Sequence, residues 1–461
     1  MSRFLQVFAR QNIDSKHLLG QPSRGQAQQV LWLSTTAFTL LFAVWLMLGV
    51  IGIPIRDEFQ LSAEQFEWAL ALSILAGSLP RLQFGIWSEK YGGRPMMIGI
   101  LLFCALPTFL LSQVTNYGGL LACAVLFGLA GNSFSVGVVW ISSWYPQSEK
   151  GTALGIFGAG NVGASLTKFL VPALLVFGPL VGMSQGLSNG GWRVIPIVYA
   201  LLLLLMAAAL WRWTPSPDRC PGRDRSLADL LKPLENIRVW RFGLYYVVVF
   251  GAYVALATYL PRHYVDEYEL SLTTAGYLTA LFIFPASLLR PLGGWLSDQY
   301  GARILSYTVF IAMLATLSLL SLPKSILELS MTTFTVLIVA LGCCMGIGKA
   351  AVFKYIPTYF PNDVGAVAGL VGTLGALGGF ILPPLLGMMS RLGLGSQVAF
   401  FPLWVLTLIS LGWLHLTVLG LLWENRSQAS QLIPANLEPN TSEPSRVRQA
   451  DASEAIGMTN S

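Results

Sequence analysis

Four cationic side chains lie inside long apolar segments of this 461-residue chain: Arg81, Lys168, Arg290 and Lys349. No aspartate or glutamate lies in the middle of such a segment, although the chain has 22 acidic residues. A charged side chain at the centre of a bilayer costs about 2.5 kcal/mol or more, so it usually faces an interior cavity and marks a function. Buried cations without buried acids therefore predict a site that holds an anion.

Arg81 and Arg290 occupy equivalent positions in an internal repeat. Residues 78–94 align without a gap with residues 287–303, and Ser, Leu, Arg, Gly, Ser, Tyr, Gly and Arg coincide. Because such repeats are related by a pseudo-two-fold axis, we expect the two arginines at similar depth on opposite walls of one cavity. A guanidinium presents a planar fork of donors that suits a planar oxyanion. The alternative is that each side chain extends to nearby lipid headgroups.

The arginines belong to segments that are long enough to cross a membrane. Of all residues 54% are hydrophobic and 11% are charged, whereas about 25% are charged in soluble domains. A stretch of about 20 apolar residues crosses a hydrocarbon core about 30 Å thick. Twelve such stretches lie at about 31–54, 65–88, 95–113, 118–143, 151–179, 193–213, 241–262, 273–297, 304–322, 332–356, 365–389 and 398–423. The sequence therefore predicts an all-α membrane protein with twelve transmembrane helices.

A second repeat supports two equivalent halves, because Gly151, Gly155 and Gly158 match Gly365, Gly369 and Gly372 in spacing. The expected parts are a cytoplasmic tail at 1–30, six-helix halves at 31–213 and 241–423, a cytoplasmic linker at 214–240 and a disordered cytoplasmic tail at 424–461. Loops on one side of the membrane carry more basic residues than the loops on the other, so both termini are expected in the cytoplasm. The net charge of +6 then reflects topology rather than nucleic-acid binding.

Other features of the sequence exclude several classes. No cleaved signal peptide is apparent, and the five cysteines indicate no disulfide framework. No cluster of histidines and cysteines has metal-ligand spacing, so neither a metal nor a cofactor is predicted. The apolar segments contain no constellation of His, Asp or Glu that could act as a catalytic site, so an enzyme is not predicted.

Each copy of the first repeat contains a motif that resembles the signature of the major facilitator superfamily. The motif residues are Gly85, Glu89 and Arg94 in one copy and Gly294, Asp298 and Arg303 in the other. A glycine lets helices approach closely, and the charged residues can tether the loop to neighbouring helix ends. The resemblance implies two pseudo-symmetric six-helix halves, and we expect gating roles for these six residues.

Glycine-rich segments narrow the resemblance to the nitrate/nitrite porter family. Residues 158–163 read Gly-Ala-Gly-Asn-Val-Gly, and residues 365–379 are similarly rich in glycine. The resemblance covers about 31–423 and implies that Arg81 and Arg290 clasp nitrate. It implies further substrate-binding roles for Phe134, Gly158, Gly160, Asn161, Gly163, Tyr246, Phe250, Gly372 and Gly375. Without the family motif, each aromatic residue would be interpreted as ordinary helix packing.

Lys349 bears on how transport is driven. It resembles a lysine of the family members that are thought to import nitrate with protons. Since no acid in the apolar segments can carry a proton, we hypothesise that Lys349 binds one when nitrate partly neutralises the nearby guanidinium groups. Lys354 is expected to extend to the cytoplasmic headgroups and Lys168 to the outer ones.

The predicted function is uptake of nitrate, and also of nitrite, by alternating access together with protons. Nitrate/nitrite exchange is the rival, because an empty carrier with two uncompensated arginines resists reorientation. An organophosphate antiporter and an anion sensor are further alternatives. We expect a monomer in the bacterial inner membrane, with the lipid bilayer as its surroundings.

Overall fold

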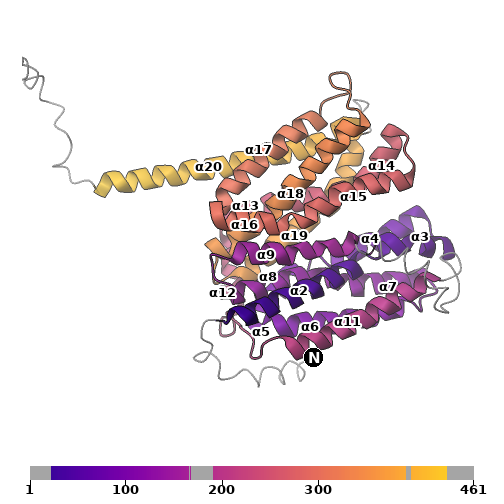
Figure 1. Ribbon diagram of the computed structural model, residues 1–461, viewed down its shortest axis with the longest axis horizontal. Helices are drawn as coiled ribbons and strands as arrows, with labels where there is room; N and C mark the ends of the chain where they lie inside the picture. Colours follow the sequence, from indigo (N-terminus) through magenta and orange to yellow (C-terminus); the bar gives the residue numbers. More distant parts are fainter. Residues whose placement is uncertain (1–21, 166, 168–190, 391–395, 433–461) are drawn as a thin grey trace, which may run out of the picture. The chain divides into compact units, whose positions relative to one another are not determined.

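The computed structural model describes residues 22–165, 167, 191–390 and 396–432. The chain forms two compact units, Met1–Leu411 and Gly412–Ser461, and the second contributes the last part of helix α20. All regular elements within the described residues are helices (Figure 1). The predicted all-α membrane fold is thereby confirmed.

The described helices follow one another in two runs separated by the linker region. The first run is α2 (Arg24–Trp45), α3 (Leu48–Glu58), α4 (Ala63–Ala76), α5 (Arg81–Tyr91), α6 (Gly93–Leu111), α7 (Tyr117–Gly128), α8 (Ser133–Trp144), α9 (Lys150–Gly158) and α11 (Val194–Trp213). After the short α12 (Leu227–Leu231), the second run is α13 (Ile237–Tyr246), α14 (Ala252–Tyr268), α15 (Leu272–Leu288), α16 (Arg290–Tyr300), α17 (Ala302–Leu320), α18 (Met331–Tyr359), α19 (Val364–Ser390) and α20 (Phe401–Leu432).

Eleven helical stretches among the described residues are long and apolar enough to cross a membrane. They correspond to eleven of the twelve predicted spans. The fifth predicted span, 151–179, begins as α9 and runs into residues outside the described ranges, which also contain Lys168. At the two ends, α2 begins at Arg24, before the predicted 31, and α20 continues to Leu432, past the predicted 423.

Caps and glycines determine where these helices begin and end. Ser62 accepts a hydrogen bond from the Gln65 backbone while the Gln65 side chain accepts one from Ser62, so α4 starts in a capping box. Gly92 and Gly301 have φ angles of 98° and 83° and connect α5 to α6 and α16 to α17. Only glycine adopts this backbone conformation readily. The repeat therefore keeps a glycine at both positions.

Among the described residues, five spans are interrupted near their middle, and Leu46 and Met47 also separate α2 from α3 in the first span. Residues 77–80 separate α4 from α5, and Leu289 separates α15 from α16. The other interruptions are the 3₁₀ turns η1 (Leu129–Asn132) and η2 (Ala159–Val162) and the π-helical turn η7 (Val247–Gly251). Such turns inside a helix often mark functional sites or hinges. Five interruptions in one bundle therefore direct attention to its middle.

The two helical runs meet through pairs of glycines. A Cβ atom on Gly85 of α5 would lie 2.2 Å from the carbonyl oxygen of Gly365 in α19. In the equivalent pair, a Cβ atom on Gly294 of α16 would lie 2.1 Å from the carbonyl oxygen of Gly151 in α9. Side chains at these positions would separate the helices, so backbone packs on backbone. We call this end of the bundle, which also carries Glu89 and Asp298, the signature end.

Candidate functional site

Arg81 and Arg290 are the first residues of α5 and α16, directly after the interruptions of their spans. Each side chain is only 1% exposed. Both guanidinium groups face one ring, because their Cζ atoms lie 5.8 Å and 5.3 Å from the centroid of Phe134. The structure thus brings the two repeat-related arginines together at a shared aromatic ring.

The two arginines differ in their hydrogen bonds. Arg81 donates from Nε to the carbonyl of Gly77 at 3.0 Å and from Nη1 to the carbonyl of Gly372 at 3.2 Å. By contrast, Nε and Nη1 of Arg290 are buried and have no hydrogen-bond partner among the described residues. An unsatisfied buried donor costs roughly 1–3 kcal/mol, and more when it is charged. These two N–H groups are therefore open to an acceptor beyond the described residues, such as a bound anion.

The three predicted aromatic residues form a row beside the arginines. The rings of Phe134 and Tyr246 have centroids 6.5 Å apart at an interplanar angle of 7°, and those of Tyr246 and Phe250 are 4.9 Å apart at 10°. Phe134 follows η1, and Tyr246 and Phe250 lie at η7, so these interruptions position all three rings. The stacked rings form an apolar wall beside the guanidinium groups, as is common in ligand sites.

Sequence reasoning missed two further aromatic residues at this site. The Arg81 Cζ atom lies 5.2 Å from the centroid of Trp45. Phe353 packs edge-on against Phe134 and Tyr246, with centroid distances of 4.9 Å and 4.7 Å. Phe353 follows Lys349 by one helical turn and so lies on the same face of α18. This spacing could have indicated Phe353 from the sequence. Trp45 has no comparable signal, since it is one of many apolar residues in its span.

Three predicted or neighbouring polar groups are among the other buried atoms that lack a partner in the described residues. They are the Tyr246 hydroxyl, the Asn161 amide nitrogen and the Ser135 hydroxyl. Tyr246 lies close to Arg290, yet its hydroxyl does not have hydrogen-bond geometry toward it. Asn161 lies in η2 and is 1% exposed. The Tyr246 hydroxyl thus adds an unpaired donor close to Arg290, while Asn161 stays a predicted ligand.

The predicted glycines make room for particular neighbours. A Cβ atom on Gly158 would lie 2.4 Å from Cζ of Arg290, and one on Gly375 would lie 2.2 Å from Cδ1 of Tyr246. At Gly372, a Cβ atom would lie 3.4 Å from Cδ of Arg81, which is an ordinary contact. Gly158 and Gly375 are therefore required for the positions of two site residues, whereas Gly372 contributes its carbonyl group.

Gly160 and Gly163 serve a different contact. A Cβ atom on Gly160 would lie 2.5 Å from Cδ1 of Phe38, and one on Gly163 would lie 2.0 Å from the carbonyl oxygen of Thr39. Both glycines thus let the fifth span pack closely against α2. The described contacts connect them with packing around the site rather than with the arginines.

Lys349 is fully buried next to the arginine site. Its Nζ atom donates to the carbonyl of Ala286 at 3.3 Å and lies 3.1 Å from the centroid of the Tyr253 ring. The same Nζ atom is 5.9 Å from the centroid of Phe250, which is also 5.9 Å from Cζ of Arg81. Phe250 thus contacts both the predicted coupling residue and the predicted anion clamp.

At the signature end, Glu89 joins α5 to α19. Its carboxylate is 1% exposed and accepts a hydrogen bond from the backbone N–H of Gly365 at 3.1 Å. Glu89 is also covered by the linker, where Gly222 N–H donates to the Glu89 carbonyl at 3.0 Å. The predicted tether to a neighbouring helix end thus has a specific contact in the structure.

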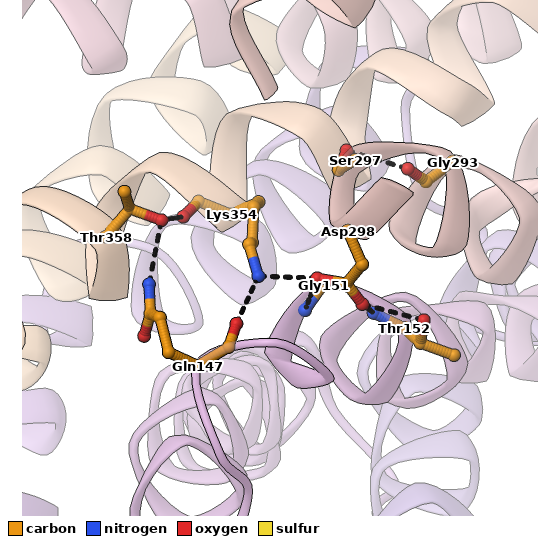
Figure 2. A network of polar contacts seen from close by, with 8 residues as sticks. All are labelled: Gln147, Gly151, Thr152, Gly293, Ser297, Asp298, Lys354 and Thr358. Carbon is orange, nitrogen blue, oxygen red and sulfur yellow. Dashed lines mark hydrogen bonds and ion pairs between the residues drawn. The ribbon is translucent and has the colours of Figure 1, made fainter. Parts of the chain in front are cut away.

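Asp298 makes the equivalent contact with more partners (Figure 2). Its carboxylate accepts hydrogen bonds from the backbone N–H groups of Gly151 at 2.9 Å and Thr152 at 2.6 Å, and from the Thr152 hydroxyl at 2.7 Å. Lys354 forms a buried ion pair with Asp298 and donates to the Gln147 carbonyl. The expectation that Lys354 extends to lipid headgroups was wrong, because this carboxylate lies within its reach.

Arg94 and Arg303 are not equivalent in their contacts. Arg94 donates from Nε to the Thr214 hydroxyl at 2.8 Å and from Nη2 to the Trp211 carbonyl at 2.6 Å. Arg303 donates to the Tyr359 hydroxyl at 3.1 Å in an exposed position. Arg94 therefore connects α6 to the end of α11, while Arg303 reaches the end of α18.

Asp218 in the linker is a structural residue that sequence reasoning missed. Its carboxylate accepts hydrogen bonds from Arg94 N at 2.7 Å, Trp140 Nε1 at 3.0 Å, Trp144 Nε1 at 3.2 Å and Arg219 N at 2.8 Å. Burial raises the pKa of this carboxyl, although the four donors oppose the effect. An aspartate in a polar loop gives no sequence signal that indole groups surround it.

Comparisons with known proteins agree with this architecture. Residues 33–383 and 242–452 match the Major Facilitator Superfamily. The "Probable nitrate/nitrite antiporter NarK1" of Thermus thermophilus is 54% identical over 416 residues, which cover 87% of this chain and 94% of that protein. The "Nitrite extrusion protein" of Bacillus subtilis is 30% identical over 387 residues, covering 84% and 92%. The chain belongs to the major facilitator superfamily and, within it, to the nitrate/nitrite porter family.

A solved structure supports the fold. The transporter FucP in its outward conformation superposes with a TM-score of 0.69 at 16% sequence identity, covering 84% of this chain and 98% of that chain. At this identity the similarity concerns the fold alone. The two-half architecture is therefore shared with transporters of other substrates, and the side chains at the centre must account for the cargo.

Proposed function

We propose that this protein is a secondary transporter that moves nitrate, and also nitrite, across the bacterial inner membrane by alternating access. The observation that carries the proposal is Arg290, whose buried Nε–H and Nη1–H groups lack an acceptor among the described residues. No ion pair with a carboxylate neutralises Arg81 or Arg290 in that part of the chain. The printed names of the two relatives support nitrate and nitrite as the anions.

The proposed binding mode follows from the shape of the anion. Nitrate is flat and carries three oxygen acceptors, so the Nε–H and Nη1–H groups of Arg290 can each donate a charge-assisted hydrogen bond to an oxyanion. The Tyr246 hydroxyl and the Asn161 amide, which are also unpaired, can donate to the remaining oxygens. The row of Phe134, Tyr246 and Phe250 provides an apolar wall beside the arginines that excludes water. Electrostatic attraction is strong in such a site because the local dielectric constant is low.

Alternating access requires that the two halves separate first at one end and then at the other. We infer that the signature end faces the cytoplasm, in agreement with the distribution of basic residues. There the glycine pairs Gly85–Gly365 and Gly151–Gly294 hold the halves in contact. Opening toward the cytoplasm must break these contacts together with those of Glu89 and Asp298.

The driving force is proposed to be proton symport through Lys349. Lys349 is buried, lies near the arginines and has no ion pair with an acid among the described residues. A proton taken from water on one side would occupy the Nζ lone pair during translocation and return to water on the other side. The rival is nitrate/nitrite exchange, which the printed name of the 54% identical relative favours.

Uptake of isotope-labelled nitrate into liposomes that contain the purified protein tests these mechanisms. Uptake driven by an inward proton gradient, without internal anion, is expected for symport. Uptake that requires internal nitrite or nitrate and ignores the proton gradient would instead establish exchange. Absence of nitrate flux under both conditions, with protein that is folded and correctly reconstituted, would overturn the proposed function.

A further inference from the structure

Tyr253 lies directly beneath the ammonium group of Lys349. The Nζ atom is 3.1 Å from the ring centroid, well inside the roughly 6 Å limit for a cation–π interaction. Tyr253 is 5% exposed and is the second residue of α14, immediately after the π-helical turn η7. The interruption of the seventh span therefore positions this ring as well as those of Tyr246 and Phe250.

The hydroxyl group of Tyr253 is also held in place. It lies 3.1 Å from the Ser287 hydroxyl, and Ser287 donates its own proton to the carbonyl of Ile283 at 3.1 Å. A serine hydroxyl has a single proton to donate, so Tyr253 is the donor to Ser287. Lys349 in turn donates to the carbonyl of Ala286, the residue before Ser287. Lys349 and Tyr253 are thus both tied to the last turn of α15, at Ala286 and Ser287, four and three residues before Arg290.

The other groups near Lys349 do not include an acid that could pair with its ammonium group among the described residues. Arg290 begins α16, four residues after Ala286, whose carbonyl accepts the hydrogen bond from Lys349. Phe250 lies at 5.9 Å and Tyr253 at 3.1 Å, from η7 and α14, and α15 presents a backbone carbonyl. Among the described residues no carboxylate forms an ion pair with it. An aromatic ring attracts an ammonium ion far more than a neutral amine, so Tyr253 acts on the protonated form selectively.

We propose that Tyr253 is the positioning residue that holds the protonated Lys349 while the anion is bound, and so makes proton-driven transport possible. The inference rests on the proposed symport. The aromatic ring is the essential part, whereas the hydroxyl group fixes its orientation through Ser287. Tyr253 thereby replaces the carboxylate that would ordinarily pair with a buried lysine.

The test compares Tyr253→Phe, which keeps the ring, with Tyr253→Leu, which removes it. Tyr264→Leu is the matched control, because Tyr264 is a fully buried tyrosine of the same helix that hydrogen-bonds to Thr335, away from Lys349. Each protein is reconstituted and assayed in two modes with labelled nitrate. One mode is uptake driven by a proton gradient over a range of pH, and the other is nitrate counterflow at equal acidic pH.

Tyr253→Leu is expected to lower gradient-driven uptake about tenfold and to move its pH profile toward acid by about one unit, the size of a desolvated cation–π contact. Counterflow should stay within about threefold of wild type, because it does not require proton release. Tyr253→Phe should keep the wild-type pH profile, and Tyr264→Leu should change both modes in parallel.

Two results would overturn the role of Tyr253 alone: an unchanged pH profile in Tyr253→Leu, or an equal loss in both modes. Wild-type protein that exchanges anions but does not respond to a proton gradient would overturn both the symport and this role. Wild-type protein without nitrate flux in either mode would overturn the proposed substrate as well.

Discussion

Arg290 and Arg81 occupy the same register of the repeat but present different groups to a ligand. Arg81 uses Nε and Nη1 to bind backbone carbonyls of Gly77 and Gly372, so its guanidinium is held in a fixed orientation. The corresponding atoms of Arg290 have no partner among the described residues. In the proposed site we therefore expect Arg81 to be the anchored wall and Arg290 to bind the anion most directly.

Replacement of Arg290 by lysine tests this division at the residue scale. Lysine keeps the positive charge but loses the planar fork, so nitrate binding should weaken by about tenfold or more, corresponding to roughly 1.5–3 kcal/mol for a charge-assisted hydrogen bond. Nitrate-dependent thermal stabilisation of the purified protein measures the loss. If Arg290→Lys bound nitrate with wild-type affinity, the positive charge alone, and not the planar guanidinium, would account for binding at this position.

Two glycines beside the arginines should respond differently to alanine. Gly158→Ala places a Cβ atom 2.4 Å from Arg290 Cζ, whereas Gly372→Ala makes an ordinary contact at 3.4 Å with Arg81 Cδ. Overpacking of this kind typically costs about 1–3 kcal/mol, so Gly158→Ala should lose most nitrate transport while Gly372→Ala retains it. Transport rates per folded molecule decide the matter. Equal loss in both variants would contradict the steric argument.

At the scale of helices, interruptions do most of the positioning. The arginines begin half-helices, and the aromatic row stands at η1 and η7. The positive end of a helix dipole favours an anion, so the half-helices α5 and α16 add to the attraction of their first residues. Helix ends also form the contacts at the signature end. There Glu89 and Asp298 accept hydrogen bonds from backbone N–H groups in the first turns of α19 and α9.

The two signature acids should differ in their contribution to stability. Asp298→Asn leaves Lys354 buried without its ion pair, and breaking such a pair costs about 3–5 kcal/mol. Glu89→Gln keeps an oxygen acceptor for the Gly365 N–H, and no ion pair with Glu89 occurs among the described residues, so about 1 kcal/mol or less is expected. Thermal unfolding of both variants in detergent gives the comparison. A larger loss in Glu89→Gln would refute it.

At the scale of the molecule, the linker connects the halves at the signature end. Asp218 binds Arg94, Trp140 and Trp144 of the first half. Arg225 donates to the Asn362 carbonyl at 2.6 Å and forms an ion pair with Asp363 at 2.6 Å, both of the second half. The segment from Asp218 to Arg225 therefore spans the contact that opens in the proposed alternating-access cycle.

Reversal of the Arg225–Asp363 pair should open this end more often. Arg225→Glu faces two carboxylates toward each other, and Asp363→Arg in the same protein should restore part of the contact. Exposed or half-exposed pairs contribute about 0.2–1 kcal/mol, so a twofold to fivefold shift in opening is expected.

Labelling of Cys220 measures the opening. Burial raises the pKa of the Cys220 thiol to about 12, so it reacts slowly with a maleimide while the linker is in place. The experiment uses protein in which the four other cysteines are alanine. Labelling should be faster in Arg225→Glu and should slow again in the double variant. Identical rates in all three proteins would show that the linker does not restrain the halves.

The sequence by itself determined the class of protein and singled out two arginines as the candidate anion site. Twelve apolar segments, a gap-free repeat and arginines without acids follow from composition and spacing, because a bilayer imposes span length and penalises unpaired charge. The family resemblance pointed to the aromatic residues and the glycines. These are properties of single segments, or of two segments that resemble each other, and they can be detected without knowing which helices touch.

Only the tertiary structure decided which side chains meet across helices. It paired Lys354 with Asp298, placed Tyr253 beneath Lys349 and surrounded Asp218 with two indole groups. It also separated Gly158, which makes room for Arg290, from Gly160 and Gly163, which pack against α2. These contacts join residues far apart in the chain, and local periodicity carries no information about them. The charges inside the bundle were evident from the sequence, but the partners that govern them depend on the packing of the helices.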